Sequence, residues 1–170
     1  MNKIVYVDET GIDTCLHRQY ARSKRGTSVI GAVSGKKFKR IGIVAAQMNK
    51  RIIAPMQYDG SMDSHLFELW FVNRLLPALP EDSVIVLDNA SFHRKSKLYC
   101  LAENTGHKII FLPPYSPELN LIEYFWSWLK RQLIPISNKL FSNPCPASNA
   151  QKFVWLHLLH GFTQPINRFF

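Results

Sequence analysis

The feature that most constrains the fold is the continuous apolar run Val84–Leu87, which reads VIVL and is closed by Asp88 and Asn89. A short run that is apolar at every position is typical of a strand buried on both faces of its sheet. Such a strand needs a covering layer on each face, and helices supply those layers in α/β proteins. The run therefore predicts a central strand in a sheet with helices on its faces.

The order of the other segments predicts how the chain builds this sheet. Before residue 60, apolar segments separated by turn residues indicate an antiparallel meander. After that, helical periodicity and short apolar runs alternate, which is typical of βαβ units. A meander that leads into βαβ units predicts a mixed sheet. The expected strands are Ile4–Val7, Ser28–Val33, Phe38–Ala46, Arg51–Tyr58, Val84–Leu87 and Lys108–Leu112; the expected helices run from 61–64 to Leu76, from Arg94 to Glu103, and from Asn120 to Leu133.

The balance of charged residues indicates what kind of partner the chain binds. The chain has 170 residues, 46% of them hydrophobic, which suits one domain with a hydrophobic core. Its net charge is +9, from 21 Lys and Arg against 12 Asp and Glu. This excess favours a polyanionic partner, with nucleic acid ahead of an anionic membrane. A basic protein without such a partner is the alternative.

The cysteines and the apolar stretches indicate the cellular compartment of the protein. Cys15, Cys100 and Cys145 are scattered and form no CxxC pair, so neither a zinc site nor a disulfide framework is indicated. Reduced thiols are typical of a cytosolic protein. The apolar stretch at the N-terminus is too short for a signal peptide, and no stretch is long enough to cross a bilayer. We expect a cytoplasmic protein.

Two aspartates occupy equivalent positions, because Asp8 directly follows Ile4–Val7 and Asp88 directly follows Val84–Leu87. If these strands are neighbours, the two side chains lie about 5 Å apart, one strand spacing. Carboxylates that close repel each other, and a divalent cation removes this cost. Oxygen ligands of this kind suit Mg²⁺ or Mn²⁺. The alternative is that each aspartate caps a strand end or a turn.

A third acid, Glu123, lies inside the apolar stretch of SPELNLIEYFWSWLK, residues 116–130. Asn120 is a candidate helix N-cap, and Glu123 three residues later completes a capping-box pattern. Capping alone would explain Glu123. The apolar face of the same helix consists of Leu121, Ile122, Phe125, Trp126, Leu129 and Leu133.

Taken together, the three acids resemble the DDE triad of the mariner-like transposase superfamily, particularly its bacterial insertion-sequence branch. Asp88 lies in VLDNASFHR, Glu123 follows PPYSPELNLI, and 34 residues separate the two acids, the spacing typical of that branch. The resemblance covers about residues 3–133. Most family members have proline where this chain has Leu121, a departure that the start of a helix tolerates.

The resemblance implies a ribonuclease H-like fold of the retroviral-integrase type, with a mixed five-stranded sheet flanked by helices. It also implies that Asp8, Asp88 and Glu123 are catalytic and together hold two Mg²⁺ or Mn²⁺ ions. The implied activity is cleavage of DNA strands at transposon ends and transfer of the 3′-OH into target DNA at TA sites. A non-catalytic remnant of a decayed element and a plain ribonuclease H-like nuclease are the alternatives.

The resemblance extends to partners and location. The expected partners are DNA and a second copy of the chain, in a homodimer or higher assembly, in a bacterial cytoplasm and on the nucleoid when DNA is bound. Because the first acid is residue 8, we expect the chain to be a catalytic half, either encoded separately from a helix-turn-helix DNA-binding half or truncated.

The remaining residues near the triad divide into candidate DNA contacts and bystanders. His93, Arg94, Lys95 and Lys130 flank the triad in sequence and are the candidate nucleic-acid contacts. Glu9 and Asp13 are alternatives to Asp8, but neither directly ends the predicted strand; we expect Asp82 to be a turn residue and Glu118 to be a bystander.

The end of the chain has a different pattern. We expect a catalytic domain over residues 1–134 and a divergent tail over 135–170, because periodicity fades after Leu133; a helical segment and a disrupted reading frame are the alternatives for this tail. Within that tail, Pro135, Pro144 and Pro146 predict a loop over 135–147.

Overall fold

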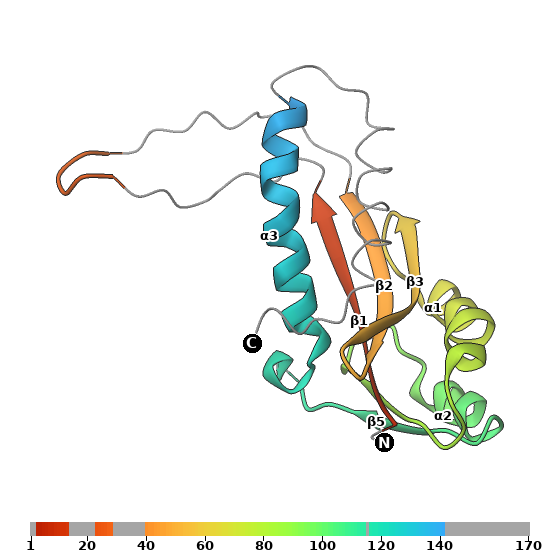
Figure 1. Ribbon diagram of the computed structural model, residues 1–170. Coiled ribbons are helices and arrows are strands. Elements are labelled where there is room, and N and C mark those ends of the chain that lie inside the picture. The colour runs from red at the N-terminus through yellow and green to blue at the C-terminus, as the bar shows by residue number, and fades with distance from the viewer. Residues whose placement is uncertain (1–2, 14–22, 29–39, 115, 142–170) are drawn as a thin grey trace.

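The computed structural model describes residues 3–13, 23–28, 40–114 and 116–141. They form a five-stranded mixed sheet with the strand order β3-β2-β1-β4-β5, flanked by helices (Figure 1). β1 pairs antiparallel with β2, and β2 with β3, whereas β1 is parallel to β4 and β4 to β5. This confirms the mixed five-stranded sheet. The strands are β1 Ile4–Asp13, β2 Arg40–Met48, β3 Arg51–Asp59, β4 Val84–Leu87 and β5 Lys108–Phe111.

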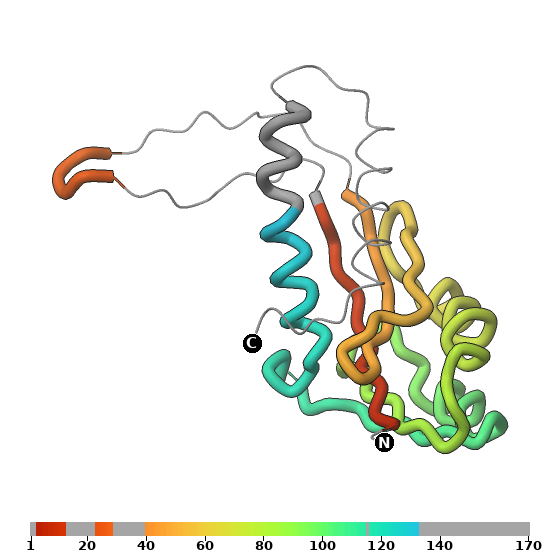
Figure 2. Tube along the Cα trace, in the orientation of Figure 1, coloured from red at the N-terminus to blue at the C-terminus, as the bar shows by residue number. Residues whose placement is uncertain are grey.

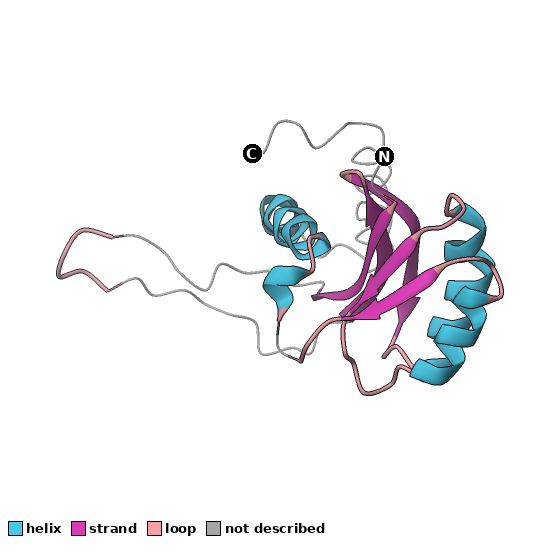
Figure 3. Ribbon diagram, turned by 90° about the horizontal axis from the view of Figure 1, so that it is seen from below, coloured by secondary structure: helices cyan, strands magenta, loops and turns pink. Residues whose placement is uncertain are grey.

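Helices cover both faces of the sheet, as the fully apolar β4 requires (Figure 3). α3 lies on one face, and α1 and α2 lie on the other (Figures 1 and 3). The helical segments are α1 Ser64–Trp70, which continues as the π-helical η1 Phe71–Leu75 and the 3₁₀ turn η2 Leu76–Ala78, then α2 Lys95–Glu103, the 3₁₀ turn η3 Pro117–Leu119 and α3 Ile122–Phe141.

Each face of the sheet has its own apolar core, because successive side chains of a strand point to opposite faces. The α1/α2 face is filled from β1 by Val5 and Val7, and the α3 face by Ile12. The largest side chains packed against the first face include Phe67, Trp70, Phe71, Ile85, Leu87 and Leu98; those against the second are Ile41, Ile43, Ile122, Phe125, Trp126 and Leu129.

β1 is longer than the sequence predicted, and its two neighbours pair with different parts of it. It runs through Asp8 to Asp13 instead of ending at Val7. β4 pairs only with Ile4–Tyr6, whereas β2 pairs with β1 from Tyr6 to Asp13. Asp8 therefore lies within a strand, just beyond the point where that strand loses β4. The parallel pairing with β4 ends at Tyr6, two residues before Asp8, while the strand itself continues.

α3 also departs from expectation. It continues through Pro135 to Phe141, so the expected loop over 135–147 is wrong for its first seven residues. A proline inside a helix lacks the N–H for one hydrogen bond, which is why the sequence favoured a break there. The proposed boundary at 134 stays a prediction, and the rest of the expected tail lies outside the described residues. So does nearly all of the expected strand Ser28–Val33.

No helix among the described residues is long and apolar enough to span a bilayer.

Candidate functional site

The three acids that the sequence singled out line one pocket. This pocket has a volume of about 380 Å³, and Asp8, Asp88 and Glu123 all face it. They come from three elements: β1, the loop after β4, and the first turn of α3. The remaining lining residues are Asn89, Ala90, Leu112, Pro113, Pro114, Ser116, Pro117 and Asn120.

The topology explains why the pocket forms here. β4 and β5 are parallel, so the loops that leave their carboxyl ends meet at one edge of the sheet. The N–H of Leu112 donates to the carbonyl of Leu87 at 2.8 Å, which holds the two loops together up to the residue before Asp88. β1 continues past this edge because its antiparallel partner β2 supports it. Asp8 is thereby presented beside the β4 loop. The trace of α3 runs alongside β1 (Figure 2), and the first turn of α3 brings Glu123 to the pocket.

Asp88 is held by two donors on one of its oxygens. His93 Nε2 lies 3.1 Å from Asp88 Oδ1, and the backbone N–H of Ala90 donates to the same oxygen at 3.2 Å. A carboxylate only accepts, so the ring hydrogen belongs on Nε2. Burial would raise the pKa of Asp88, but the hydrogen bonds from His93 and Ala90 keep it below its usual value. Both donors therefore act on Oδ1 of a carboxylate that lines the pocket.

The pKa of Asp8 is shifted in the opposite direction from that of Asp88. Burial, followed by repulsion from Glu123 and Asp88, raises the pKa of Asp8 to about 7. Its Oδ2 is buried and has no hydrogen-bond partner in the described part of the chain. The indole N–H of Trp126 is near enough to lower the pKa of Asp8 a little, but Trp126 Nε1 and Asp8 Oδ2 do not form a hydrogen bond. The effect of Glu123 and Asp88 on Asp8 shows that the three carboxyl groups share one electrostatic site.

A fourth acid is close. Glu9 follows Asp8 on β1, so its side chain projects to the other face of the sheet. Burial raises the pKa of Glu9 to about 8, with further contributions from Asp88 and Asp8. The sequence left Glu9 as an alternative to Asp8, but Asp8 lines the pocket and Glu9 does not.

The capping-box interpretation of Glu123 is wrong. α3 begins at Ile122, and the N–H of Asn120, which a capping glutamate would bind, donates instead to the carbonyl of Pro117 at 3.0 Å. The side chain of Asn120 does not cap the helix either: its Nδ2 donates to the carbonyl of Val7 at 3.1 Å. Glu123 therefore does not cap the helix, and its side chain lines the pocket together with Asp8 and Asp88.

The donor set suits a hard divalent cation. Three carboxylates face the pocket, one of them with a buried oxygen that has no partner, and Mg²⁺ and Mn²⁺ prefer oxygen ligands of this kind. Within the described ranges, no three acidic, histidine or cysteine side chains are already gathered at the distance needed to ligate an ion. The residues fit such an ion in type and location.

The candidate nucleic-acid contacts have different surroundings. The side chain of His93 is only 1% exposed, and its ring packs against Phe67 and Phe92 with centroids 4.4 and 4.3 Å away. This burial contradicts the expectation that His93 contacts nucleic acid. Arg94 is half exposed, with Nε 3.1 Å from Glu68 Oε1. Lys95 is exposed, with its Nζ 5.1 Å from the centroid of the Phe111 ring.

Lys130 lies on α3, seven residues after Glu123. Residues seven apart lie on the same face of a helix, so Lys130 continues the face that carries Glu123. Contacts of Arg94, Lys95 and Lys130 with DNA stay predictions.

Comparison with solved structures defines the class of fold. The chain superimposes on the Mos1 transposase in its paired-end complex with the left transposon end with a TM-score of 0.72 and 16% sequence identity, covering 96% of this chain and 49% of that one. The Mos1 strand transfer complex gives 0.73 and 16%, covering 96% and 48%. The fold is therefore the ribonuclease H-like fold of this transposase, and the chain spans about half the length of the Mos1 chains.

Comparison of sequences then defines the family. The family described as DDE superfamily endonuclease matches residues 3–142, and the chain belongs to that family. Among curated proteins it is similar to the uncharacterized protein y4pE/y4sA of Sinorhizobium fredii. The two are 29% identical over 126 residues, which cover 71% of this chain and 82% of that protein.

Proposed function

We propose that the chain is the catalytic domain of a DNA transposase, which cleaves DNA strands at transposon ends and joins the resulting 3′-OH to target DNA. The observation that carries this proposal is the single pocket that collects Asp8, Asp88 and Glu123 from three separate elements. Membership in the DDE superfamily endonucleases supports a nuclease or transferase activity. One Mos1 structure that the chain resembles is a strand transfer complex, which supports the joining step.

In this proposal, Asp8, Asp88 and Glu123 hold two divalent cations, Mg²⁺ or Mn²⁺. Such ions supply Lewis acidity and positive charge to phosphoryl transfer at a phosphodiester. Solved Mos1 paired-end complexes with Mn and with Mg have this fold, which supports the choice of ions. His93 and the Ala90 N–H keep Asp88 ionised at neutral pH, so this ligand is ready when a cation arrives.

The finer parts of the proposal concern substrate and assembly. We infer that the target is cut at TA dinucleotides, that the chain works as a dimer or higher assembly on DNA, and that a helix-turn-helix half recognises the transposon ends. The net charge of +9 supports a DNA partner.

A DNA cleavage assay tests the proposal. The chain is incubated with labelled duplexes that carry the element's ends, with Mg²⁺, Mn²⁺ or EDTA, and with a separately supplied helix-turn-helix half in a parallel series. We expect metal-dependent 3′-OH ends, and joined products when target DNA is added. Asp88→Asn should abolish both while leaving the far-UV circular dichroism spectrum unchanged.

The rival functions give other products. Cutting without joining would point to a plain nuclease. The absence of metal-dependent cutting in every series would point to a non-catalytic remnant and overturn the proposal.

A further inference from the structure

Asn120 is a buried polar residue between η3 and α3 for which the proposed function has no role so far. It is 2% exposed and lines the same pocket as Asp8 and Glu123. Its Nδ2 donates to the carbonyl of Val7, 113 residues earlier, and its own carbonyl accepts the N–H of Glu123 at 3.0 Å. One residue thus holds the peptide that leads into Asp8 and the peptide that contains Glu123.

The orientation of this amide follows from its partner. Val7 offers a carbonyl oxygen, which only accepts, so the NH₂ group of Asn120 must face it. Oδ1 is then turned away from Val7, and it is buried without a hydrogen-bond partner in the described part of the chain. A buried amide with an unsatisfied oxygen is costly, so its presence at this position calls for an explanation beyond packing.

The contact between α3 and the sheet explains why such a link matters. Otherwise, α3 rests on β1 and β2 through apolar side chains, among them Ile122, Trp126 and Leu129. Apolar burial is not directional, so it holds the helix against the sheet without fixing its position along β1. A hydrogen bond between Asn120 and Val7 is directional and fixes that position at the level of Asp8.

We propose that Asn120 is a positioning residue that sets the separation and orientation of Asp8 and Glu123, and that it holds the two carboxylates in register for a divalent cation. The inference rests on the proposed function for its catalytic meaning, but the structural coupling does not depend on it. Asn120 itself touches no reacting atom in this role.

The experiment compares Asn120→Ala and Asn120→Asp with wild type; Asn120→Asp keeps the shape but lacks the Nδ2 donor. The matched control is Asn104→Ala, since Asn104 is an exposed asparagine at the end of α2. Three quantities are measured: amide hydrogen exchange in the metal-free protein, the Mn²⁺ dissociation constant by calorimetry, and kcat and KM for DNA cleavage.

Both Asn120 variants should exchange the amide hydrogens of the first turn of α3 about 10-fold faster than wild type, with global melting still cooperative. In Asn120→Ala, Mn²⁺ affinity and kcat should each fall about 10- to 100-fold, with KM for DNA unchanged, as expected of residues that orient metal ligands. Asn120→Asp adds a carboxylate to the pocket, so this variant is assessed by hydrogen exchange alone. Asn104→Ala should match wild type in all three.

Exchange in the first turn of α3 that matches wild type in both Asn120 variants would overturn the positioning role, whatever the activity. A second outcome is also informative: both variants exchange faster, and the wild-type protein neither binds Mn²⁺ nor cuts DNA. This outcome would support the positioning role of Asn120 and overturn the proposed function instead. If both variants unfold, Asn120→Ser offers a smaller loss of side chain with a shorter polar group, and the same exchange measurement decides.

Discussion

Asp8 and Glu9 are consecutive carboxyl groups on opposite faces of one strand, with pKa values raised to about 7 and about 8. In the unfolded chain these pKa values are about 3.8 and 4.5. The folded state therefore binds protons more tightly; this stabilisation is fully present only below about pH 4 and is lost progressively as the pH rises to about 7 to 8. We expect the metal-free protein to melt several degrees lower at about pH 8.5 than at about pH 5.

Differential scanning calorimetry measures this dependence. Asp8→Asn should flatten the profile, because it removes one of the two groups. Mn²⁺ should raise the melting temperature more at the higher pH, where it does not compete with protons for the carboxylates. A melting temperature that increases steadily from pH 5 to 8.5 without metal would contradict the electrostatic picture of the site.

His93 gives a second prediction at this scale. His93→Phe keeps an aromatic ring among Phe67 and Phe92 but removes the donor to Asp88 Oδ1. Mn²⁺ affinity should fall about 10-fold, since the ligand loses its orienting partner. Isothermal titration calorimetry provides the measurement, and His65→Phe, an exposed histidine at the start of α1, is the control. Equal Mn²⁺ affinities in His93→Phe and wild type would exclude an orienting role for His93.

The positions of the acids could be predicted from the sequence, but the residues that hold them could not. Asp8 and Asp88 each follow an apolar run, and their register follows from parallel pairing of the two runs. The bond from Asn120 to Val7 joins positions 113 residues apart, and no local pattern encodes it. Locally, Asn120 matched an N-cap, because a cap and a long-range donor use the same amide.

At the scale of elements, α1 and α2 are joined through one buried acid. Glu68 on α1 has a side chain that is 7% exposed; its Oε2 lies 2.6 Å from Lys97 Nζ, and Arg94 approaches Oε1. Glu68→Gln keeps the shape and removes the charge. We expect a loss of about 1–2 kcal/mol in the free energy of unfolding, less than for a fully buried pair, because Lys97 and Arg94 are half exposed.

Urea denaturation at low and high salt measures this loss, and Glu103→Gln, an exposed acid on α2, is the control. The loss should shrink at high salt because the cations are open to solvent. An unchanged urea midpoint at low salt would show that the packing of α1 and α2 does not depend on this pair.

The limits of the elements show which sequence rules failed. β4 was predicted residue for residue, because an apolar run bounded by polar residues marks both ends of a buried strand. β1 was predicted too short, because Asp8 and Glu9 break its apolar pattern, although pairing with β2 carries the strand on to Asp13. α3 continued through Pro135, where a rule for isolated helices predicts an end.

At the scale of the whole molecule, the meander and the βαβ units could be predicted from the sequence. The strand order of the sheet could not, because it depends on how the meander and the βαβ units pair with each other. β1 lies at the centre of the order β3-β2-β1-β4-β5, with an antiparallel neighbour on one side and a parallel neighbour on the other. The two neighbours leave β1 at different residues, and the pocket opens at that offset. The pocket takes Asp8 from the strand that the meander and the βαβ units share, and Asp88 and Glu123 from the later part of the chain. Neither the meander nor the βαβ units should therefore bind a cation alone.

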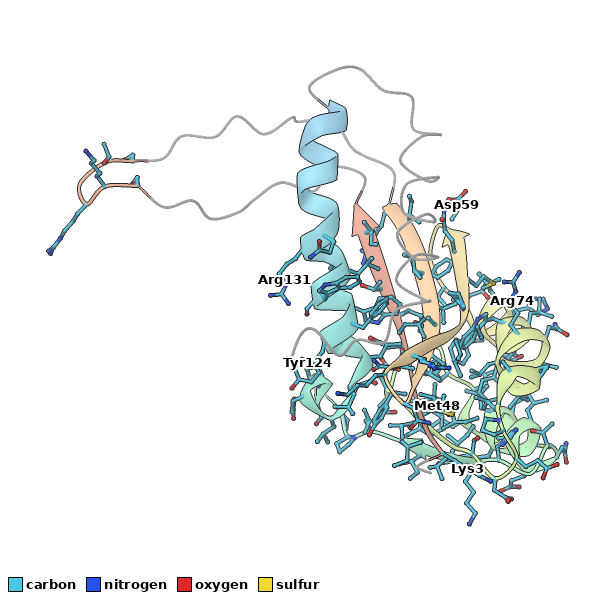
Figure 4. The ribbon with its side chains drawn as sticks, in the orientation of Figure 1. Lys3, Met48, Asp59, Arg74, Tyr124 and Arg131 are labelled. Atoms are coloured by element: carbon cyan, nitrogen blue, oxygen red, sulfur yellow. The ribbon has the colours of Figure 1, made fainter. Side chains whose placement is uncertain are left out.

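The charge of the molecule gives a last prediction. With a net charge of +9, the chain should bind duplex DNA through phosphates, and the logarithm of the binding constant should fall linearly with the logarithm of salt, by about 0.9 for each phosphate neutralised. Lys130 shares a helix face with Glu123, and its neighbour Arg131 projects outward from α3 (Figure 4). Lys130→Ala should therefore lower that slope by about 1.

Fluorescence anisotropy over a salt series measures both slopes. The matched control is Lys3→Ala, because Lys3 lies away from α3 at the edge of the molecule (Figure 4) and its Nζ bonds the carbonyl of Glu81 at 2.6 Å. A slope for Lys130→Ala that equals the slope for Lys3→Ala would place the DNA on another face. In that case, the face of α3 that carries Glu123 would contribute its carboxylate to the pocket without contacting the DNA backbone beside it.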